Sequence, residues 1–229
     1  MWGLFWRLYA AHLFADFPLQ TPAILSQKNR FKGIFIHAVL VLVTSAIVIV
    51  QGAVFRPVLF AMLLILFVLH FAIDWTKSLT GQVSARTGLL LFFADQIAHL
   101  GVILLLATVF GWQYFYGPLS PFIRLSLAIF AIWVAPVIIY ITRRAIKNNE
   151  EVGIYVERFS KFAKVERALL FIGLSFRSLP IVIICVIAAV LIRALLLLNE
   201  ENVPVPVWEW IFVILSALAG RLVEYGTII

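Results

Sequence analysis

The sequence has few of the groups that soluble proteins expose to water. Only 13% of its 229 residues are charged, and 64% are hydrophobic. A soluble domain has about a quarter charged residues and about half apolar ones, so this composition excludes an ordinary soluble domain. A single cysteine, Cys185, excludes a disulfide within the chain. Sustained apolar–polar alternation is also missing, which argues against a transmembrane β-barrel.

The chain instead carries apolar runs, and a membrane-spanning helix needs about 20 mainly apolar residues. These runs predict an all-α fold, a polytopic transmembrane bundle of about seven spans. The first run is the shortest and is expected either to span or to insert only in part. Tyr155, Phe159 and Phe162 recur at helical spacing among basic residues, which predicts an amphipathic surface helix at 153–167. The predicted spans are 2–16, 34–51, 58–75, 87–110, 120–141, 179–198 and 207–222.

The distribution of Lys and Arg predicts the orientation. Basic residues gather after the first, third and fifth runs, for example Lys28, Lys77 and Arg144, while Glu200 and Glu201 follow the sixth. By the positive-inside rule, the N-terminus lies outside and the C-terminus in the cytoplasm. The net charge of +7 suits anionic membrane lipids, so we expect lipids as partners and no nucleic acid.

The composition changes near residue 100, because every His and every Asp lies before it. We interpret 1–110 as the helices that bear the candidate site, and 111–229 as mainly structural helices of the same compact bundle. In the second part, Glu166 and Arg167 are expected to pair with each other or to lie at the membrane interface. Arg193 is expected to extend toward the membrane surface.

Four His and three Asp form the candidate site. Six of them make pairs four residues apart, and residues at this spacing share one face of a helix. The alternating helix directions place all seven at a similar depth, on the cytoplasmic side. Ionisable groups inside a span cost about 2.5–3.5 kcal/mol each and face the bundle interior. The pairs are His12 with Asp16, His70 with Asp74 and Asp95 with His99, and the seventh residue is His37.

All seven residues are candidate metal ligands. Mixed imidazole and carboxylate groups suit zinc, iron or manganese, and the set is large enough for one or two ions. Asp16 and Asp95 are the candidate general bases. Gln20, Lys28, Lys77 and Gln96 flank the cluster and are candidates to bind substrate. The lysines would equally anchor the chain to headgroups, the glutamines would equally be structural, and Asp74 has Lys77 within one turn as a simple ion-pair partner.

The sequence also resembles a bacterial membrane family catalogued as domain of unknown function 3307. The motifs that carry the resemblance cover about the first hundred residues, and the second half is similar more loosely through residues 165–167, Arg193 and Glu209. The resemblance implies a bacterial inner-membrane location and no established activity. In order, the motifs are HLFADFPLQT at 12–21, HA at 37–38, HFAIDWTK at 70–77 and DQIAH at 95–99.

These observations favour a metal-dependent membrane enzyme, a hydrolase acting on a lipid or phosphorylated lipid at the cytoplasmic leaflet. One alternative is a transporter or channel for a metal ion or protons. Another is a non-catalytic membrane protein whose cluster only locks the bundle, and a third is haem held by His37 and His70. The apolar outer halves of the spans disfavour a path across the membrane, and the three Asp disfavour haem.

Overall fold

The computed structural model describes ten segments of the chain, and their regular structure is helical without a strand. The all-α prediction is therefore confirmed for these segments. The segments are 1–21, 24, 26–28, 30–50, 57–81, 83–111, 119–147, 152–175, 178–199 and 207–226. The helices are α1 (Trp2–Asp16), α3 (Phe31–Val50), α4 (Pro57–Ser78), α5 (Ala85–Phe110), α6 (Ser120–Ile129), the π-helix η1 (Phe130–Val134), α7 (Ala135–Lys147), α8 (Val152–Ser175), α9 (Leu179–Asn199) and α10 (Val207–Gly226).

Among the described residues, four stretches of helix are long and apolar enough to cross a membrane. They are Phe31–Ile49, Pro57–Ser78, Ala85–Phe110 and Ser120–Ile146, the last made of α6, η1 and α7. Leu179–Ala194 is a shorter apolar helix. Within the described residues, each of the seven predicted runs is helical, so a helical membrane bundle is confirmed. The total of seven spans and the orientation stay predictions.

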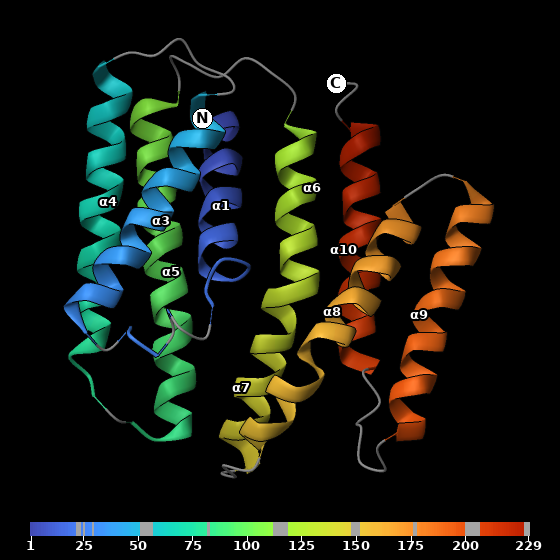
Figure 1. The fold of residues 1–229 in the computed structure, drawn as a ribbon. Helices are drawn as coiled ribbons and strands as arrows, with labels where there is room; N and C mark the ends of the chain where they lie inside the picture. Colours follow the sequence, from blue (N-terminus) through green and yellow to red (C-terminus); the bar gives the residue numbers. More distant parts are fainter. Residues whose placement is uncertain are drawn as a thin grey trace. The chain divides into compact units, whose positions relative to one another are not determined.

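The chain divides into two compact units, Met1–Ser126 and Leu127–Ile229. The first unit is built on α1, α3, α4 and α5, which lie side by side in Figure 1. α1 packs against α3 and α5, and α4 packs against the same two helices. The division at residue 110 into site-bearing and structural parts stays a prediction.

Local sequence signals set the ends of the helices that carry the site. Ser84 caps α5, because its side-chain oxygen accepts the Thr87 N–H at 3.2 Å. Pro57 begins α4, where its missing N–H costs no hydrogen bond. Between them, Gly81 has a φ of +63°, a conformation that glycine adopts without strain. The turn therefore reverses the chain directly after α4.

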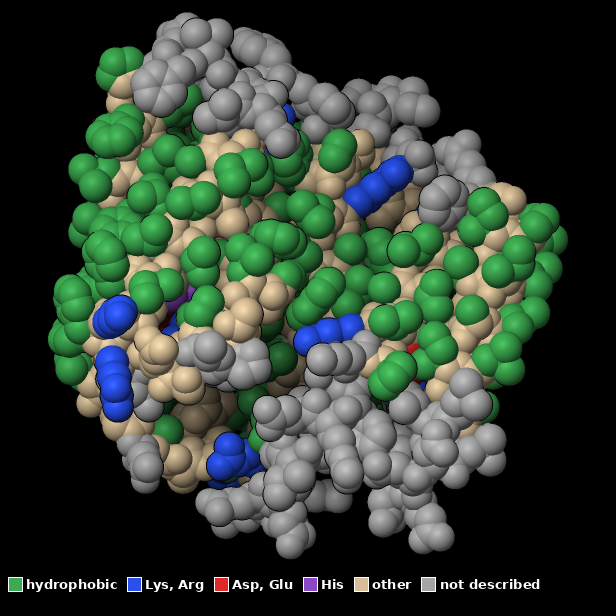
Figure 2. Space-filling model, viewed as in Figure 1, with side chains coloured by type: hydrophobic (Ala, Val, Ile, Leu, Met, Phe, Trp, Pro, Cys, Tyr) green, Lys and Arg blue, Asp and Glu red, His purple; other side chains and the backbone are tan. Residues whose placement is uncertain are grey.

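The surface of the described residues is strongly apolar. Figure 2 shows hydrophobic side chains covering most of the described surface on one face of the molecule, with few Lys and Arg among them. Large apolar residues stay exposed along the helices, including Phe60, Leu90, Ile97 and Ile184. A water-soluble protein rarely exposes so much continuous apolar surface. Helices that face lipid acyl chains do, which agrees with the membrane assignment.

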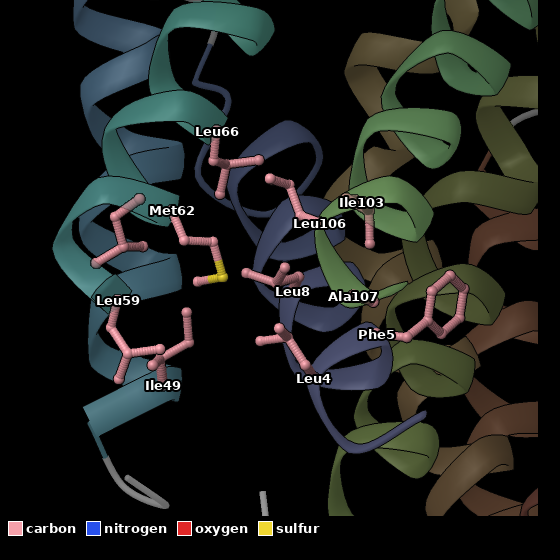
Figure 3. Packing of buried hydrophobic residues seen from close by; sticks show 11 residues of the cluster. Leu4, Phe5, Leu8, Ile49, Leu59, Met62, Leu66, Ile103, Leu106 and Ala107 are labelled. Carbon is pink, nitrogen blue, oxygen red and sulfur yellow. The ribbon is translucent and has the colours of Figure 1, made fainter. Parts of the chain in front are cut away.

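One half of the first unit is filled by apolar side chains. They come from the beginnings of α1 and α4 and from the ends of α3 and α5, which meet at the same end of the bundle. Figure 3 shows Met62 of α4 pointing toward Leu8 of α1, with Leu66 near Leu106 of α5. This core comprises Leu4, Phe5, Leu8, Ile49, Leu59, Met62, Leu63, Leu66, Ile103, Leu106 and Ala107.

In the second unit, α8 packs against α9 and α10. α8 approaches α9 closely at Gly173, where an added Cβ would lie 2.5 Å from the Cβ of Cys185. α8 extends beyond the amphipathic segment predicted at 153–167. The predicted pattern at Tyr155 and Phe159 falls on side chains outside the described residues, whereas Phe162 is exposed.

Four charged residues of the second unit are paired differently from the sequence-based expectation. Glu166 is fully buried and pairs with Arg193 of α9 at 2.6 Å, while Arg167 pairs with Glu209 of α10. Arg193 is itself buried, so the expectation that it extends to the membrane surface was wrong. Glu166 and Arg167 do not pair with each other, because adjacent residues on a helix do not face one another.

Candidate functional site

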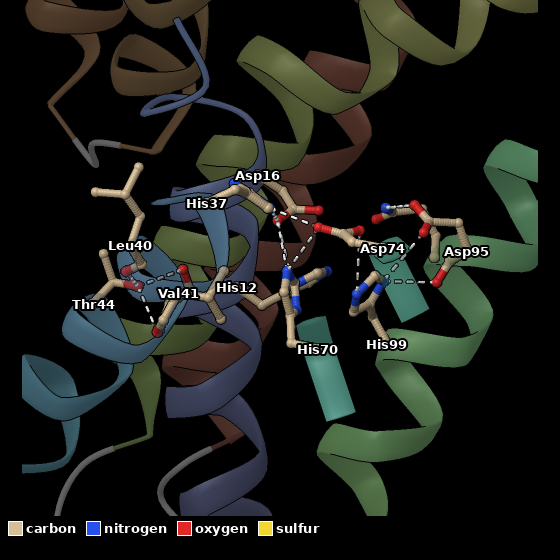
Figure 4. Close-up of polar contacts among 12 residues, drawn as sticks. His12, Asp16, His37, Leu40, Val41, Thr44, His70, Asp74, Asp95 and His99 are labelled. Atoms are coloured by element: carbon tan, nitrogen blue, oxygen red, sulfur yellow. Dashed lines mark hydrogen bonds and ion pairs between the residues drawn. The ribbon is translucent and has the colours of Figure 1, made fainter. Parts of the chain in front are cut away.

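The seven predicted ligands meet inside the first unit, at the end of the bundle opposite the apolar core. α1 brings His12 and Asp16, α3 brings His37, α4 brings His70 and Asp74, and α5 brings Asp95 and His99 (Figure 4). Every one is buried, with at most 7% of its surface exposed. The three pairs four residues apart each point inward from one helix face, as their spacing predicted.

The rings and carboxylates are closely spaced. The centroids of His70 and His99 lie 4.1 Å apart, and His12 stacks on His99 at 5.0 Å. Asp16 Oδ1 lies 3.0 Å from His37 Nε2 and 3.7 Å from His12 Nδ1. The cluster is thus one continuous polar core with contributions from all four helices.

Most of these separations are too long for hydrogen bonds. His70 Nε2 lies 3.5 Å from Asp74 Oδ2, His37 Nε2 lies 3.6 Å from the same oxygen, and His99 Nε2 lies 3.9 Å from Asp74 Oδ1. An N–H···O bond spans about 2.7–3.2 Å. Two ligands of one tetrahedral ion, each bound at about 2.1 Å, lie roughly 3.4 Å apart. The spacing therefore fits ligands of a common ion better than a hydrogen-bonded network.

The unmet hydrogen-bonding capacity leads to the same conclusion. Each of the seven side chains has at least one buried nitrogen or oxygen without a hydrogen bond of good geometry, and both nitrogens of His12 lack a partner. The closest approach, 3.0 Å between Asp16 Oδ1 and His37 Nε2, has the length of a hydrogen bond but not its geometry. Leaving a buried polar group unsatisfied costs about 1–3 kcal/mol. Three overlapping triads have ligand atoms within 4.8 Å of one another. They are His12–Asp16–His70, His37–His70–Asp74 and Asp74–Asp95–His99.

One hydrogen bond fixes the orientation of His99. Its Nδ1 lies 2.9 Å from the backbone oxygen of Asp95, one turn earlier on α5. Because a carbonyl oxygen only accepts, Nδ1 carries the proton and Nε2 keeps its lone pair. Nε2 is the nitrogen that faces Asp74. This second contact of the ring is typical of metal-binding histidines.

Lys77 and Gln96, two of the predicted flanking residues, contact Asp95. Lys77 Nζ donates to Asp95 Oδ2 at 2.8 Å, and Gln96 Nε2 donates to the same oxygen at 3.3 Å. The alternative in which Lys77 pairs with Asp74 was wrong, because the lysine crosses to α5. Sequence spacing missed this pair, since it joins residues on two helices.

Gln20 and Lys28 lie on the segment that follows α1. The Gln20 amide is oriented with its nitrogen toward the backbone of Asp16 and its oxygen toward Lys28. Its nitrogen donates to the backbone oxygen of Asp16 at 3.1 Å. Its oxygen accepts from Lys28 Nζ. In the same segment, Thr21 Oγ1 accepts the Ile24 N–H at 3.4 Å. Gln20 therefore connects Lys28 to the helix end that carries Asp16.

A pocket of about 350 Å³ opens beside the cluster. Asp74 lies in its wall beside Lys77, so the pocket adjoins the cluster at Asp74. Lys28 contributes a second positive charge, and the turn after α4 contributes hydroxyl groups. The lining residues are Lys28, Ile34, Asp74, Lys77, Ser78, Thr80, Gly81, Val83, Gly88 and Leu91.

The fold and the cluster together define a class: an all-α membrane protein with a buried His/Asp core. A family model described as "Protein of unknown function (DUF3307)" matches residues 4–119. The chain belongs to this family, which confirms the resemblance seen in the sequence. The matched residues include all seven cluster residues and the four flanking ones. No curated protein and no solved structure matches the chain.

Proposed function

We propose that this protein is a metal-dependent membrane hydrolase that acts on a phosphorylated lipid at the cytoplasmic leaflet. The observation that carries the proposal is the set of unpaired, buried ligand atoms at separations suited to one coordination sphere. A cluster that served only to lock the helices would gain stability by satisfying these atoms.

The donor set limits the choice of metal. Four imidazoles and three carboxylates suit zinc, iron or manganese. Such an ion polarises a phosphoryl or acyl oxygen and brings the pKa of its bound water close to neutrality. Asp16 and Asp95 remain the candidates to accept the proton of that water. Lys77 and Gln96 hold Oδ2 of Asp95, so its Oδ1 is the oxygen left to bind the ion or to accept this proton.

The pocket supports an anionic substrate. Lys28 and Lys77 line it next to Asp74, and lysine side chains bind phosphate as point charges. The apolar surface around the first unit would keep the lipid tail in the bilayer while the headgroup enters the pocket. The assignment to the cytoplasmic leaflet rests on the basic loops after the first and third predicted spans.

The apolar core disfavours the transport alternative. It fills the other half of the same bundle with side chains such as Leu8, Met62 and Leu106. A transporter needs polar groups that continue across the membrane, because ions in the bilayer centre are costly unless solvated or paired.

The test is phosphate release from a panel of phosphatidic acid, polyprenyl phosphate and polyprenyl diphosphate by purified protein. We expect turnover that chelator abolishes and that zinc, iron or manganese restores. His70→Ala should be inactive, and the control Thr44→Val should be active. Thr44 is a buried residue of α3 whose hydroxyl bonds only to backbone oxygens among its described contacts.

Activity that persists in chelator, or in both Asp16→Asn and Asp95→Asn, would contradict the proposed chemistry. Metal flux into liposomes without any hydrolysis would favour the transporter.

A further inference from the structure

Asp74 has an unusual position within the cluster, because its two carboxylate oxygens face different sets of histidines. Oδ2 lies 3.6 Å from His37 Nε2 and 3.5 Å from His70 Nε2. Oδ1 lies 3.9 Å from His99 Nε2. Figure 4 shows Asp74 between His70 on one side and His99 on the other. A carboxylate placed in this way can bind two ions at once, one through each oxygen.

On the Oδ2 side, four ligand atoms form a closed ring. Asp16 Oδ1 is 3.0 Å from His37 Nε2 and 4.0 Å from His70 Nε2, and Asp74 Oδ2 completes the ring. The edges of this ring scatter around the roughly 3.4 Å expected between ligands of a tetrahedral ion. Two histidines and two aspartates would close this coordination sphere. The site is deeply buried, since His37 is fully inaccessible.

On the Oδ1 side, Asp74, Asp95 and His99 make a second triad. His99 Nδ1 donates to the backbone oxygen of Asp95, which leaves His99 Nε2 available for an ion. Oδ1 of Asp95 has no hydrogen-bond partner. Three protein ligands leave a coordination position open, as catalytic sites require. This side also adjoins the pocket, because Asp74 and Lys77 line it and Lys77 holds Asp95.

The charges favour two ions for an anionic substrate. One divalent ion together with Lys77 would neutralise the three carboxylates and leave only Lys28 of the pocket wall to attract a phosphate. Two divalent ions would leave two positive charges, which a phosphate dianion would neutralise. Because the interaction energy of charges is larger in low-dielectric surroundings than in water, the net charge of this buried cluster strongly affects phosphate binding.

We infer that the cluster holds two divalent ions bridged by Asp74: a closed site of Asp16, His37, His70 and Asp74, and an open site of Asp74, Asp95 and His99 that faces the pocket. This inference rests on the proposed metal centre. It assigns attack on the substrate to the open site and support to the closed one. Ions bridged in this way lie about 3.5–4 Å apart.

The test is metal stoichiometry and electron paramagnetic resonance of the full-length protein loaded with manganese in detergent. We expect two ions per chain and the signal of an exchange-coupled manganese pair. His99→Ala, which removes one ligand of the open site, should retain one ion with an uncoupled signal. Thr44→Val should keep two coupled ions.

One ion per chain in the unsubstituted protein, or two ions without coupling, would overturn the inference. Two coupled ions in His99→Ala would overturn it as well. A single ion with chelator-sensitive hydrolysis would leave the proposed hydrolase standing, whereas no bound metal would remove both proposals.

Discussion

Lys77 on α4 forms its ion pair with Asp95 on α5, at 2.8 Å, rather than with Asp74 one turn earlier on its own helix. The pair joins the two helices on either side of the turn at Gly81. It satisfies one oxygen of Asp95 and leaves both oxygens of Asp74 facing histidines. The only lysine bonded to the cluster, among the described residues, thus lies on the side of the proposed open site.

Replacing Lys77 by Met should destabilise the protein, because Oδ2 of the buried Asp95 would lose its charged donor. A hydrogen bond to a charged group contributes about 1.5–3 kcal/mol. Because the Lys77 side chain is half-exposed and water screens its charge, we expect a loss near the lower end of this range. Thermal unfolding in detergent would measure the loss, with the exposed Lys32→Met as the matched control. Adding Asp95→Asn should recover part of the stability. Equal unfolding of the two lysine variants would contradict this role for the pair.

Gly33 should not tolerate a side chain. An added Cβ would lie 2.1 Å from the backbone oxygen of Gln27. Gly33→Ala must therefore move the chain between Lys28 and His37, at a cost of about 1–3 kcal/mol for overpacking. We also expect weaker metal binding, because His37 lies one turn further along α3.

Gly101→Ala is the matched control for Gly33→Ala. Its Cβ would meet nothing within 4 Å, so it should be neutral or should stabilise α5 by up to about 1 kcal/mol through helix propensity. Comparable melting temperatures for the two alanine variants would show that the close approach at Gly33 is not a constraint.

The ion pair between Glu166 and Arg193 gives a prediction for the second unit. Arg193→Met leaves a buried carboxylate without its cation, and breaking a buried pair in this way costs about 3–5 kcal/mol. The double variant Glu166→Gln with Arg193→Met should be clearly more stable than the single one. Trp210 Nε1 donates to Glu166 Oε1 at 2.5 Å, and the glutamine oxygen can accept the same bond. Denaturation curves showing no difference between the single and double variants would refute the importance of the pair.

The sequence predicted that these seven side chains come together because the signal is local. Two residues four apart share a helix face whatever the tertiary structure, and antiparallel helices with similar apolar lengths bring such faces to one depth. His37 fitted the same depth without a partner on its own helix. The helices themselves followed from the apolar runs, although η1 interrupts the expected helix at Phe130–Val134, just before Pro136. A proline inside a helix removes the hydrogen bond to the residue four positions earlier, which is a sequence signal for such an irregularity.

The pairings between helices could not be predicted from one sequence. Lys77 has Asp74 within one turn, and only the packing of α4 on α5 favours Asp95. Glu166 and Arg167 look like natural partners in the sequence, yet they point about 100° apart around α8 and meet different helices. Arg193 lies in an apolar run near a helix end, where extension to the surface is the usual outcome. Its burial depends on a carboxylate 27 positions away.

The unpaired atoms of the cluster make stability measurements a test between a metal centre and a cluster that only locks the helices. In chelator the unsatisfied imidazoles and carboxylates destabilise the fold. Replacing His70 by an apolar residue should therefore change the free energy of unfolding little, or even raise it. With metal present, the intact cluster should gain about 2.7 kcal/mol at a hundredfold excess of ion over its dissociation constant.

The most direct measurement is therefore thermal unfolding of the protein and of His70→Leu, each in chelator and with added zinc or manganese. A metal centre predicts that metal raises the melting temperature of the unsubstituted protein and raises that of His70→Leu by clearly less. It also predicts that the two are about equally stable in chelator. The contradicting result is a melting temperature of the unsubstituted protein that metal does not change, together with a decrease of several degrees on His70→Leu. That result would favour a cluster that only locks the helices.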